Sequence, residues 1–124
     1  MKKETLYKQQ IIDHYKYPHN HGVLDDCTHK AEETNSSCGD EVKVTLKVEN
    51  GVVNDVKFEA RGCAISIAAA SMLSDQIKGL KVEELHDLEK LSLKLINMDE
   101  SSGRIKCGTL AAKAVEKAIR PRAV

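Results

Sequence analysis

The clearest pattern in the chain is a pair of alternating apolar runs separated by Asn50 and Gly51. Apolar residues occupy every second position over residues 42–48 and again over residues 56–60, with polar residues between them. Such alternation predicts two strands, each with one buried face and one wet face. Asn-Gly predicts the two-residue turn of a β-hairpin, because both residues tolerate a positive φ angle.

The register of this hairpin brings two cysteines to one place. With a two-residue Asn-Gly turn, Val42 lies opposite Glu59. Extending the same register outward places Cys38 opposite Cys63, at the open end of the hairpin. Two thiols that are far apart in sequence can therefore share a metal ion.

Apolar stripes at helical spacing predict helices in the rest of the chain. A short strand is also predicted around residues 28–34, and its acidic residues place it at the edge of the sheet. Because the hairpin has one apolar face, the covering layer must be helical. The predicted helices are residues 4–16, 64–78, 82–97 with a break near Asp87, and 108–119.

Composition and charge narrow the classes of function. The chain has 124 residues, of which 41% are hydrophobic, so residues 1–124 are predicted to form a single domain. Nineteen basic and nineteen acidic residues cancel, which argues against a general binder of nucleic acid or membrane surfaces. No apolar stretch approaches the about 20 residues that cross a bilayer, and the first residues do not resemble a signal peptide, so we expect a cytoplasmic location.

Three of the four cysteines have neighbours that suggest chemistry. Cys63 and Cys107 each lie where a loop turns into a predicted helix, and a helix N-terminus lowers the pKa of a thiol. Cys38 is followed two residues later by Asp40, so a thiolate and a carboxylate can face one cation. Three thiolates and one carboxylate form a four-ligand set, which favours zinc or an iron–sulfur cluster.

The spacing leaves three alternatives open: a metal or cluster site, nucleophilic thiols, or incidental buried cysteines. The paired Cys-x₂₋₄-Cys motif of structural zinc sites is absent, and single ligands from three loops suit a site that opens and releases its metal. Cys27 lacks a ligand-like neighbour and is interpreted as an incidental thiol. His14, His19 and His21 straddle a helix end at Pro18, and we interpret them as surface histidines.

The motifs around the three cysteines are similar to those of the iron–sulfur cluster assembly family that includes IscU, SufU and the N-terminal domain of NifU. Residues 12–22 resemble the family's Asp-His-Tyr-x-x-Pro-x-Asn-x-Gly opening. The other matching segments are Cys38-Gly39-Asp40, Gly62-Cys63-Ala64-Ile65-Ser66 and Arg104-Ile105-Lys106-Cys107. In combination these motifs are specific, and the similarity runs nearly the length of the chain.

The resemblance implies an α+β fold with a small antiparallel sheet of about three strands, helices on one face and the cysteine loops gathered at one tip. It implies that Cys38, Cys63 and Cys107 bind a [2Fe–2S] cluster, iron or zinc, with Asp40 as the neighbouring ligand. The expected partners are a SufS- or IscS-like cysteine desulfurase and recipient apo iron–sulfur proteins or another scaffold. Cys107 is the predicted sulfur acceptor, because its loop and basic neighbours should leave it approachable.

Two branches of this family compete. Lys106 stands where IscU-type sequences carry a histidine, and residues 99–103 lack the Leu-Pro-Pro-Val-Lys chaperone motif of that type. The Arg-x-x-Cys motif resembles SufU, which implies a zinc-dependent sulfurtransferase, but the usual SufU insertion between Cys63 and Cys107 is missing. The predicted function is therefore a cluster assembly scaffold, with a zinc-dependent sulfurtransferase and a domain held together by structural zinc as alternatives.

Overall fold

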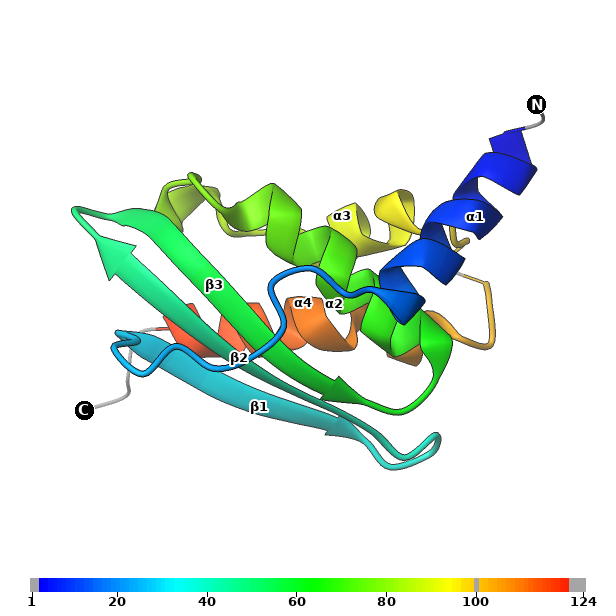
Figure 1. Cartoon of the computed structure of the whole chain (residues 1–124), viewed down its shortest axis with the longest axis horizontal. Coiled ribbons are helices and arrows are strands. Elements are labelled where there is room, and N and C mark those ends of the chain that lie inside the picture. The colour runs from blue at the N-terminus through cyan, green and yellow to red at the C-terminus, as the bar shows by residue number, and fades with distance from the viewer. Residues whose placement is uncertain (1–2, 100, 121–124) are drawn as a thin grey trace.

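The computed structural model describes residues 3–99 and 101–120 (Figure 1). The described part of the chain begins with one α-helix, continues with three consecutive strands and ends with three more α-helices. In chain order the elements are α1 (Lys3–Lys16), β1 (His29–Asn35), β2 (Asp40–Glu49), β3 (Val52–Arg61), α2 (Ala64–Ile77), the 3₁₀ turn η1 (Val82–Glu84), α3 (Leu88–Leu95) and α4 (Ile105–Ile119).

The strands form one antiparallel sheet in the order β1-β2-β3. Helices α2 and α4 cover one face of it: α4 packs on β1 and β2, and α2 packs on β3. Helix α1 lies on α2, and α3 lies against α4. This is the predicted α+β fold with helices on one face. Its core includes Val42, Val44, Leu46, Val56 and Phe58 of the sheet, Leu73 and Ile77 of α2, and Leu110 and Val115 of α4.

The hairpin register departs from the prediction by one residue. The pair next to the turn, Glu49 and Val52, is as predicted, but an extra residue in β3 forms a bulge shortly after it. Beyond the bulge Val42 pairs with Ala60 and not with Glu59. The shift places apolar side chains opposite apolar ones on the core face, which the unshifted register would not do.

The helices follow the predicted ranges to within a few residues, and the largest shift is at the start of α4. The stripe over residues 82–97 is divided, as expected, at Asp87, whose φ of +54° lies in the left-handed region. Helix α4 begins at Ile105, three residues before its predicted start, so Cys107 lies in the first turn of the helix. Among the described helices, none has the length and apolar character needed to cross a membrane.

The connection from α1 to β1 wraps around the sheet. The backbone N–H of Gly22 donates to the Phe58 carbonyl at 2.9 Å, and the Phe58 N–H donates to the Asn20 carbonyl at 3.0 Å, so this connection pairs with the outer side of β3. It then crosses the face of the sheet opposite the helices (Figure 1), where the Leu24 N–H donates to Thr45 Oγ1 at 3.0 Å. The fold thus holds residues 17–28 against both α2 and the sheet.

Candidate metal centre

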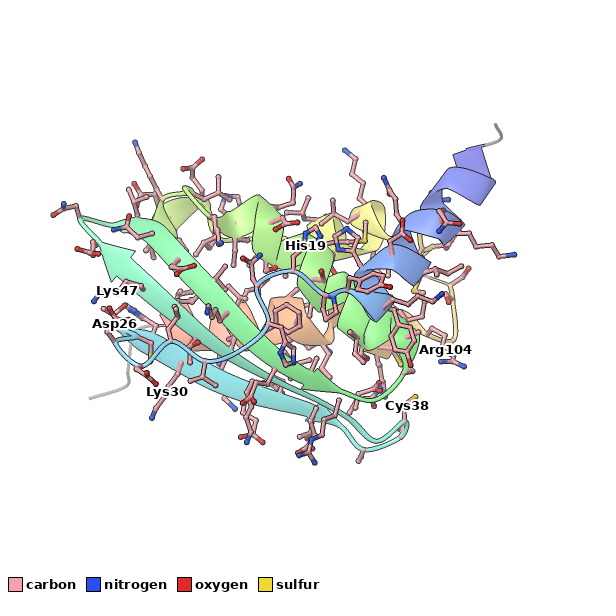
Figure 2. All side chains as sticks on the ribbon, viewed as in Figure 1. His19, Asp26, Lys30, Cys38, Lys47 and Arg104 are labelled. Atoms are coloured by element: carbon pink, nitrogen blue, oxygen red, sulfur yellow. The ribbon has the colours of Figure 1, made fainter. Side chains whose placement is uncertain are left out.

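Four predicted ligand residues meet at one end of the sheet. Cys38 lies in the turn between β1 and β2, and Asp40 is the first residue of β2. Cys63 is the N-cap of α2, and Cys107 lies in the first turn of α4. The cysteine loops are therefore gathered at one tip, as predicted, and Figure 2 shows Cys38 and Arg104 at this end of the molecule.

The distances between these side chains suit a single metal ion. Cys107 Sγ lies 3.5 Å from Cys38 Sγ, and the ligand atoms of Cys38, Asp40 and Cys107 all lie within 4.8 Å of one another. Cys63 adjoins this group, with its Sγ 4.0 Å from Asp40 Oδ2. Thiolates on one tetrahedral zinc ion lie about 3.8 Å apart, so the sulfur atoms of Cys38 and Cys107 are already near the spacing that zinc requires.

Asp40 is the buried centre of the group, with 1% of its surface exposed. Its Oδ1 accepts a 2.8 Å hydrogen bond from the backbone N–H of Cys63. Burial opposes ionisation of this carboxyl, but the hydrogen bonds, led by that of Cys63, outweigh it and hold the pKa of Asp40 below its usual value. The carboxylate is therefore charged at neutral pH and available to a cation.

Gly62 makes room for this carboxylate. Its φ of +124° lies in a region that L side chains rarely adopt. A Cβ at this position would lie 2.0 Å from Asp40 Oδ1 and 2.8 Å from Asp40 Cα. Glycine is thus required both by the backbone conformation and by the close approach of β2.

The thiols of Cys63 and Cys107 differ in acidity. Burial opposes ionisation of Cys63, but the backbone N–H and hydroxyl of Ser66 outweigh it and hold the pKa of Cys63 below its usual value, as predicted for a helix N-terminus. Burial, followed by the neighbouring Asp40, raises the pKa of Cys107 well above its usual value. The predicted lowering is therefore wrong for Cys107, because burial and a nearby carboxylate outweigh the helix terminus.

The expected accessibility of Cys107 is also wrong. Only 1% of its surface is exposed, whereas Cys38 is an exposed residue of the turn above it. Arg104 lies beside the site, and the thiolates, first that of Cys63, raise the pKa of its guanidinium. The site thus opens to solvent at Cys38, and the role of Cys107 as sulfur acceptor stays a prediction.

Two polar residues of the site were not identified from the sequence. Asn35 Nδ2 lies 3.7 Å from Cys107 Sγ, and Ser66 Oγ lies 3.7 Å from Cys63 Sγ while donating to the Cys107 carbonyl at 3.3 Å. Ser66 lies three residues after Cys63, the N-cap of α2, and a polar side chain at that position faces the cap. Its place in the site could therefore have been predicted from the sequence. Asn35 has no such signal, because its position depends on the pairing of β1 with β2.

The fourth cysteine lies outside the centre. In the described part of the chain, Cys27 joins no group of residues that could hold a metal, and its side chain is half-buried. Its interpretation as an incidental thiol stays a prediction.

Comparison with known families gives this centre a context. The model of the family described as "NifU-like N terminal domain" matches residues 6–121. The chain belongs to this family. Relatives from both branches considered above are similar to it. This NifU-like domain is 39% identical to the zinc-dependent sulfurtransferase SufU of Bacillus subtilis (strain 168), an alignment that covers 94% of this chain and 90% of the relative. It is 40% identical to the iron–sulfur cluster assembly scaffold protein IscU of Thermotoga maritima, with 94% of each chain covered.

Solved structures confirm the fold of the NifU-like domain. A putative iron–sulfur cluster assembly scaffold protein for the SUF system from Fervidobacterium islandicum AW-1 superposes with a TM-score of 0.81 at 27% identity, covering 96% of this chain and 100% of that one. A nitrogen-fixing NifU-like protein (N-terminal) from Brucella abortus gives a TM-score of 0.76 at 25% identity, with 94% of each chain covered. The similar identities to SufU and IscU relatives do not separate the two branches.

Proposed function

We propose that this NifU-like domain is an iron–sulfur cluster assembly protein, which accepts sulfur from a cysteine desulfurase and builds or relays a [2Fe–2S] cluster as its cargo. The proposal is supported by one observation above all: three cysteine sulfurs and a buried carboxylate from separate connections meet at one end of the molecule. In this proposal Cys38, Cys63 and Cys107 supply thiolates, and Asp40 supplies the remaining ligand.

The donor set suits cargo that must leave again. Thiolates are the ligands that iron–sulfur clusters require, and a carboxylate holds iron less firmly than a fourth thiolate. Cys38 lies on an exposed turn, so a recipient protein can reach this edge of the cluster first. An open ligand set with one weak member therefore favours transfer over permanent storage.

The test is anaerobic reconstitution with ferrous iron, cysteine, a desulfurase and a thiol reductant, which supplies the electrons that convert the transferred sulfur to sulfide. We expect a thiolate-to-iron absorption band in the wild type, and its loss in the Cys38→Ser, Cys63→Ser and Cys107→Ser variants. Cys27→Ser is the matched control and should keep the band. If the wild type gives no band while zinc stays tightly bound, the scaffold function is rejected.

A zinc-dependent sulfurtransferase is the second candidate function. It is favoured by the 3.5 Å separation of Cys38 Sγ and Cys107 Sγ, which is close to the spacing on a zinc ion. Zinc at the four ligands would supply the charge that keeps a bound thiol deprotonated, although burial raises the pKa of Cys107 in the metal-free chain. The Cys107 thiolate would attack the outer sulfur of a desulfurase persulfide, whose S–S bond breaks and releases the desulfurase thiolate.

Desulfurase turnover tests this second candidate. We expect turnover to rise when the zinc-loaded protein is added and to return to baseline with Cys107→Ala, while Cys27→Ala stimulates as the wild type does. Because Cys38 shields Cys107, sulfur transfer to Cys107 requires the turn at residues 36–39 to move. Unchanged stimulation by Cys107→Ala would remove Cys107 as the acceptor.

A further inference from the structure

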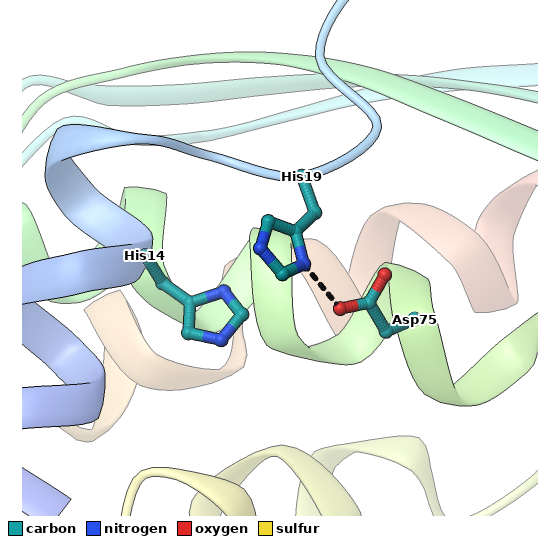
Figure 3. A group of neighbouring side chains, drawn as sticks. All are labelled: His14, His19 and Asp75. Carbon is teal, nitrogen blue, oxygen red and sulfur yellow. Dashed lines mark hydrogen bonds and ion pairs between the residues drawn. The ribbon is translucent and has the colours of Figure 1, made fainter.

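We propose that His14, His19 and Asp75 form a second metal site, which takes a divalent first-row transition ion such as Zn²⁺ or Fe²⁺ (Figure 3). Each residue offers one ligand atom, and these three atoms lie within 4.8 Å of one another. Neighbouring ligand atoms around a zinc ion lie about 3.4 Å apart when metal–ligand bonds are about 2.1 Å long. Small side-chain rotations are therefore enough to close the group around an ion.

Folding assembles this group from three segments. His14 lies in the last turn of α1, His19 in the connection that follows, and Asp75 in the second half of α2. Sequence spacing alone did not suggest a site here, because the carboxylate comes from a helix more than fifty residues away. His21, the third histidine of the segment, does not join the group and lies against the Phe58 ring instead.

A shared serine holds the two histidines in place. Ser71 Oγ accepts the backbone N–H of His19 at 2.7 Å and lies 2.6 Å from His14 Nδ1. The two imidazole rings consequently lie next to each other (Figure 3), tilted by 51° and with their centroids 4.5 Å apart. The contact between His14 Nδ1 and Ser71 Oγ fixes the orientation of the imidazole, as outer-shell hydrogen bonds do for ligating histidines.

The carboxylate is oriented in the same way. Asn20 Nδ2 donates to Asp75 Oδ1 at 2.9 Å and to Ser74 Oγ at 2.8 Å, which leaves Oδ2 directed at His19. Asp75 Oδ2 accepts a hydrogen bond from His19 Nδ1–H at 2.5 Å (Figure 3). An ion would take the place of that proton. Both side chains are about half exposed, so they can separate enough to admit it.

Ligand chemistry selects the class of ion. Two imidazoles and one carboxylate suit zinc and ferrous iron, whereas magnesium and calcium prefer oxygen ligands. Lys94 lines the hollow beside the group, and its positive charge opposes the negative charge of Asp75. The ion would therefore be held mainly by coordination to the imidazoles.

The proposed site is separate from the cysteine centre. Cys63 caps the start of α2, and Asp75 lies twelve residues further along the same helix, which corresponds to about 18 Å. One ion cannot bridge that distance, so the proposal predicts two independent sites per chain and does not rest on the proposed function. A hollow of about 470 Å³, lined by His14 and Asp75, adjoins the group and leaves room for water ligands. The bound ion would also link α1 and the connection after it to α2.

The test uses the full chain with its cysteine centre removed, as Cys38→Ser/Cys63→Ser/Cys107→Ser. Calorimetric titration should find one Zn²⁺ per chain, and Co²⁺ should give a visible band without sulfur-to-cobalt charge transfer. Adding His14→Gln or His19→Gln should weaken Zn²⁺ binding at least about tenfold. His86→Gln is the matched control and should change nothing, because the exposed His86–Asp87 pair joins no metal-capable group among the described residues.

A second measurement covers the case in which the triple variant fails to fold. Zinc content of the otherwise wild-type chain should fall by one ion per chain with His14→Gln or His19→Gln, and stay unchanged with His86→Gln. Separate anaerobic titrations with Fe²⁺ and Zn²⁺ identify the preferred ion. The proposal is overturned if the histidine variants keep the zinc content and the affinity of the wild type, or if Mg²⁺ binds as tightly as Zn²⁺.

Discussion

Replacing Gly62 by alanine should both destabilise the fold and weaken the cysteine centre. A side chain at φ +124° costs about 1–3 kcal/mol of conformational strain. The new Cβ would also stand 2.0 Å from Asp40 Oδ1 and 2.8 Å from Asp40 Cα, and this backbone atom belongs to β2 and cannot rotate away. Overpacking of this kind costs about 1–3 kcal/mol more, so we expect unfolding free energy to fall by about 2–6 kcal/mol.

Gly79→Ala separates the two contributions. Gly79 has a φ of +87°, but a Cβ there would meet no described atom within 4 Å, so only the conformational strain applies. Urea unfolding of the metal-free proteins should show Gly62→Ala to be less stable than Gly79→Ala by about 1–3 kcal/mol. Zinc affinity should fall for Gly62→Ala alone, because only that variant displaces Asp40. Equal losses of stability together with equal zinc affinities would refute the reasoning.

Two further predictions concern acid and metal removal. Because the pKa of Asp40 is lowered by folding, its contribution to stability is complete above its unfolded pKa of about 3.9 and is lost as pH falls through the folded value. Asp40→Asn should therefore flatten the acid limb of a pH–stability profile of the metal-free protein, and an unchanged limb would contradict this. Chelation should leave the far-ultraviolet circular dichroism intact, because the core joins sheet and helices without the cysteines; unfolding on chelation would instead favour the structural-zinc alternative.

The hairpin shows how far alternation predicts a sheet. Its strands and turn follow from the apolar pattern and the Asn-Gly pair, yet the register beyond the turn is off by one residue. The burial pattern gives the reason. Val53, Val56 and Phe58 are buried, so the inward-facing residues on either side of Asn54 are three positions apart and not two. A strict two-residue period cannot accommodate that step, and the bulge absorbs it.

Helix α4 begins three residues before the predicted range 108–119, because Gly108 does not interrupt it. Gly108 lies inside the helix, where a Cβ would stand 2.7 Å from Ile96 Cδ1, so close packing on α3 and its following turn explains it. Cys107 is buried on a different side of α4, where it meets Asn35, Cys38 and Asp40, although the local sequence presents it as a residue at the end of a loop. Sequence therefore identified the donor atoms of the centre, but their exposure depends on how the helices pack.

The histidine group could not be predicted from the same information. His14 and His19 are separated by a helix end, and nothing near either of them in sequence points to Asp75. Their proximity results from the docking of α1 on α2, with Ser71 and Asn20 as the contacts that fix it. Such tertiary contacts follow from no local periodicity.

The wrapped connection between α1 and β1 has a consequence for solubility. By pairing with Phe58, residues 20–22 occupy backbone groups that would otherwise be free to recruit a strand from another molecule. At the opposite edge of the sheet, the charged residues Lys30, Glu32 and Glu33 of β1 disfavour pairing with another molecule. Removing the N-terminal segment would expose this edge of β3, and the truncated chain should then associate through intermolecular β-pairing.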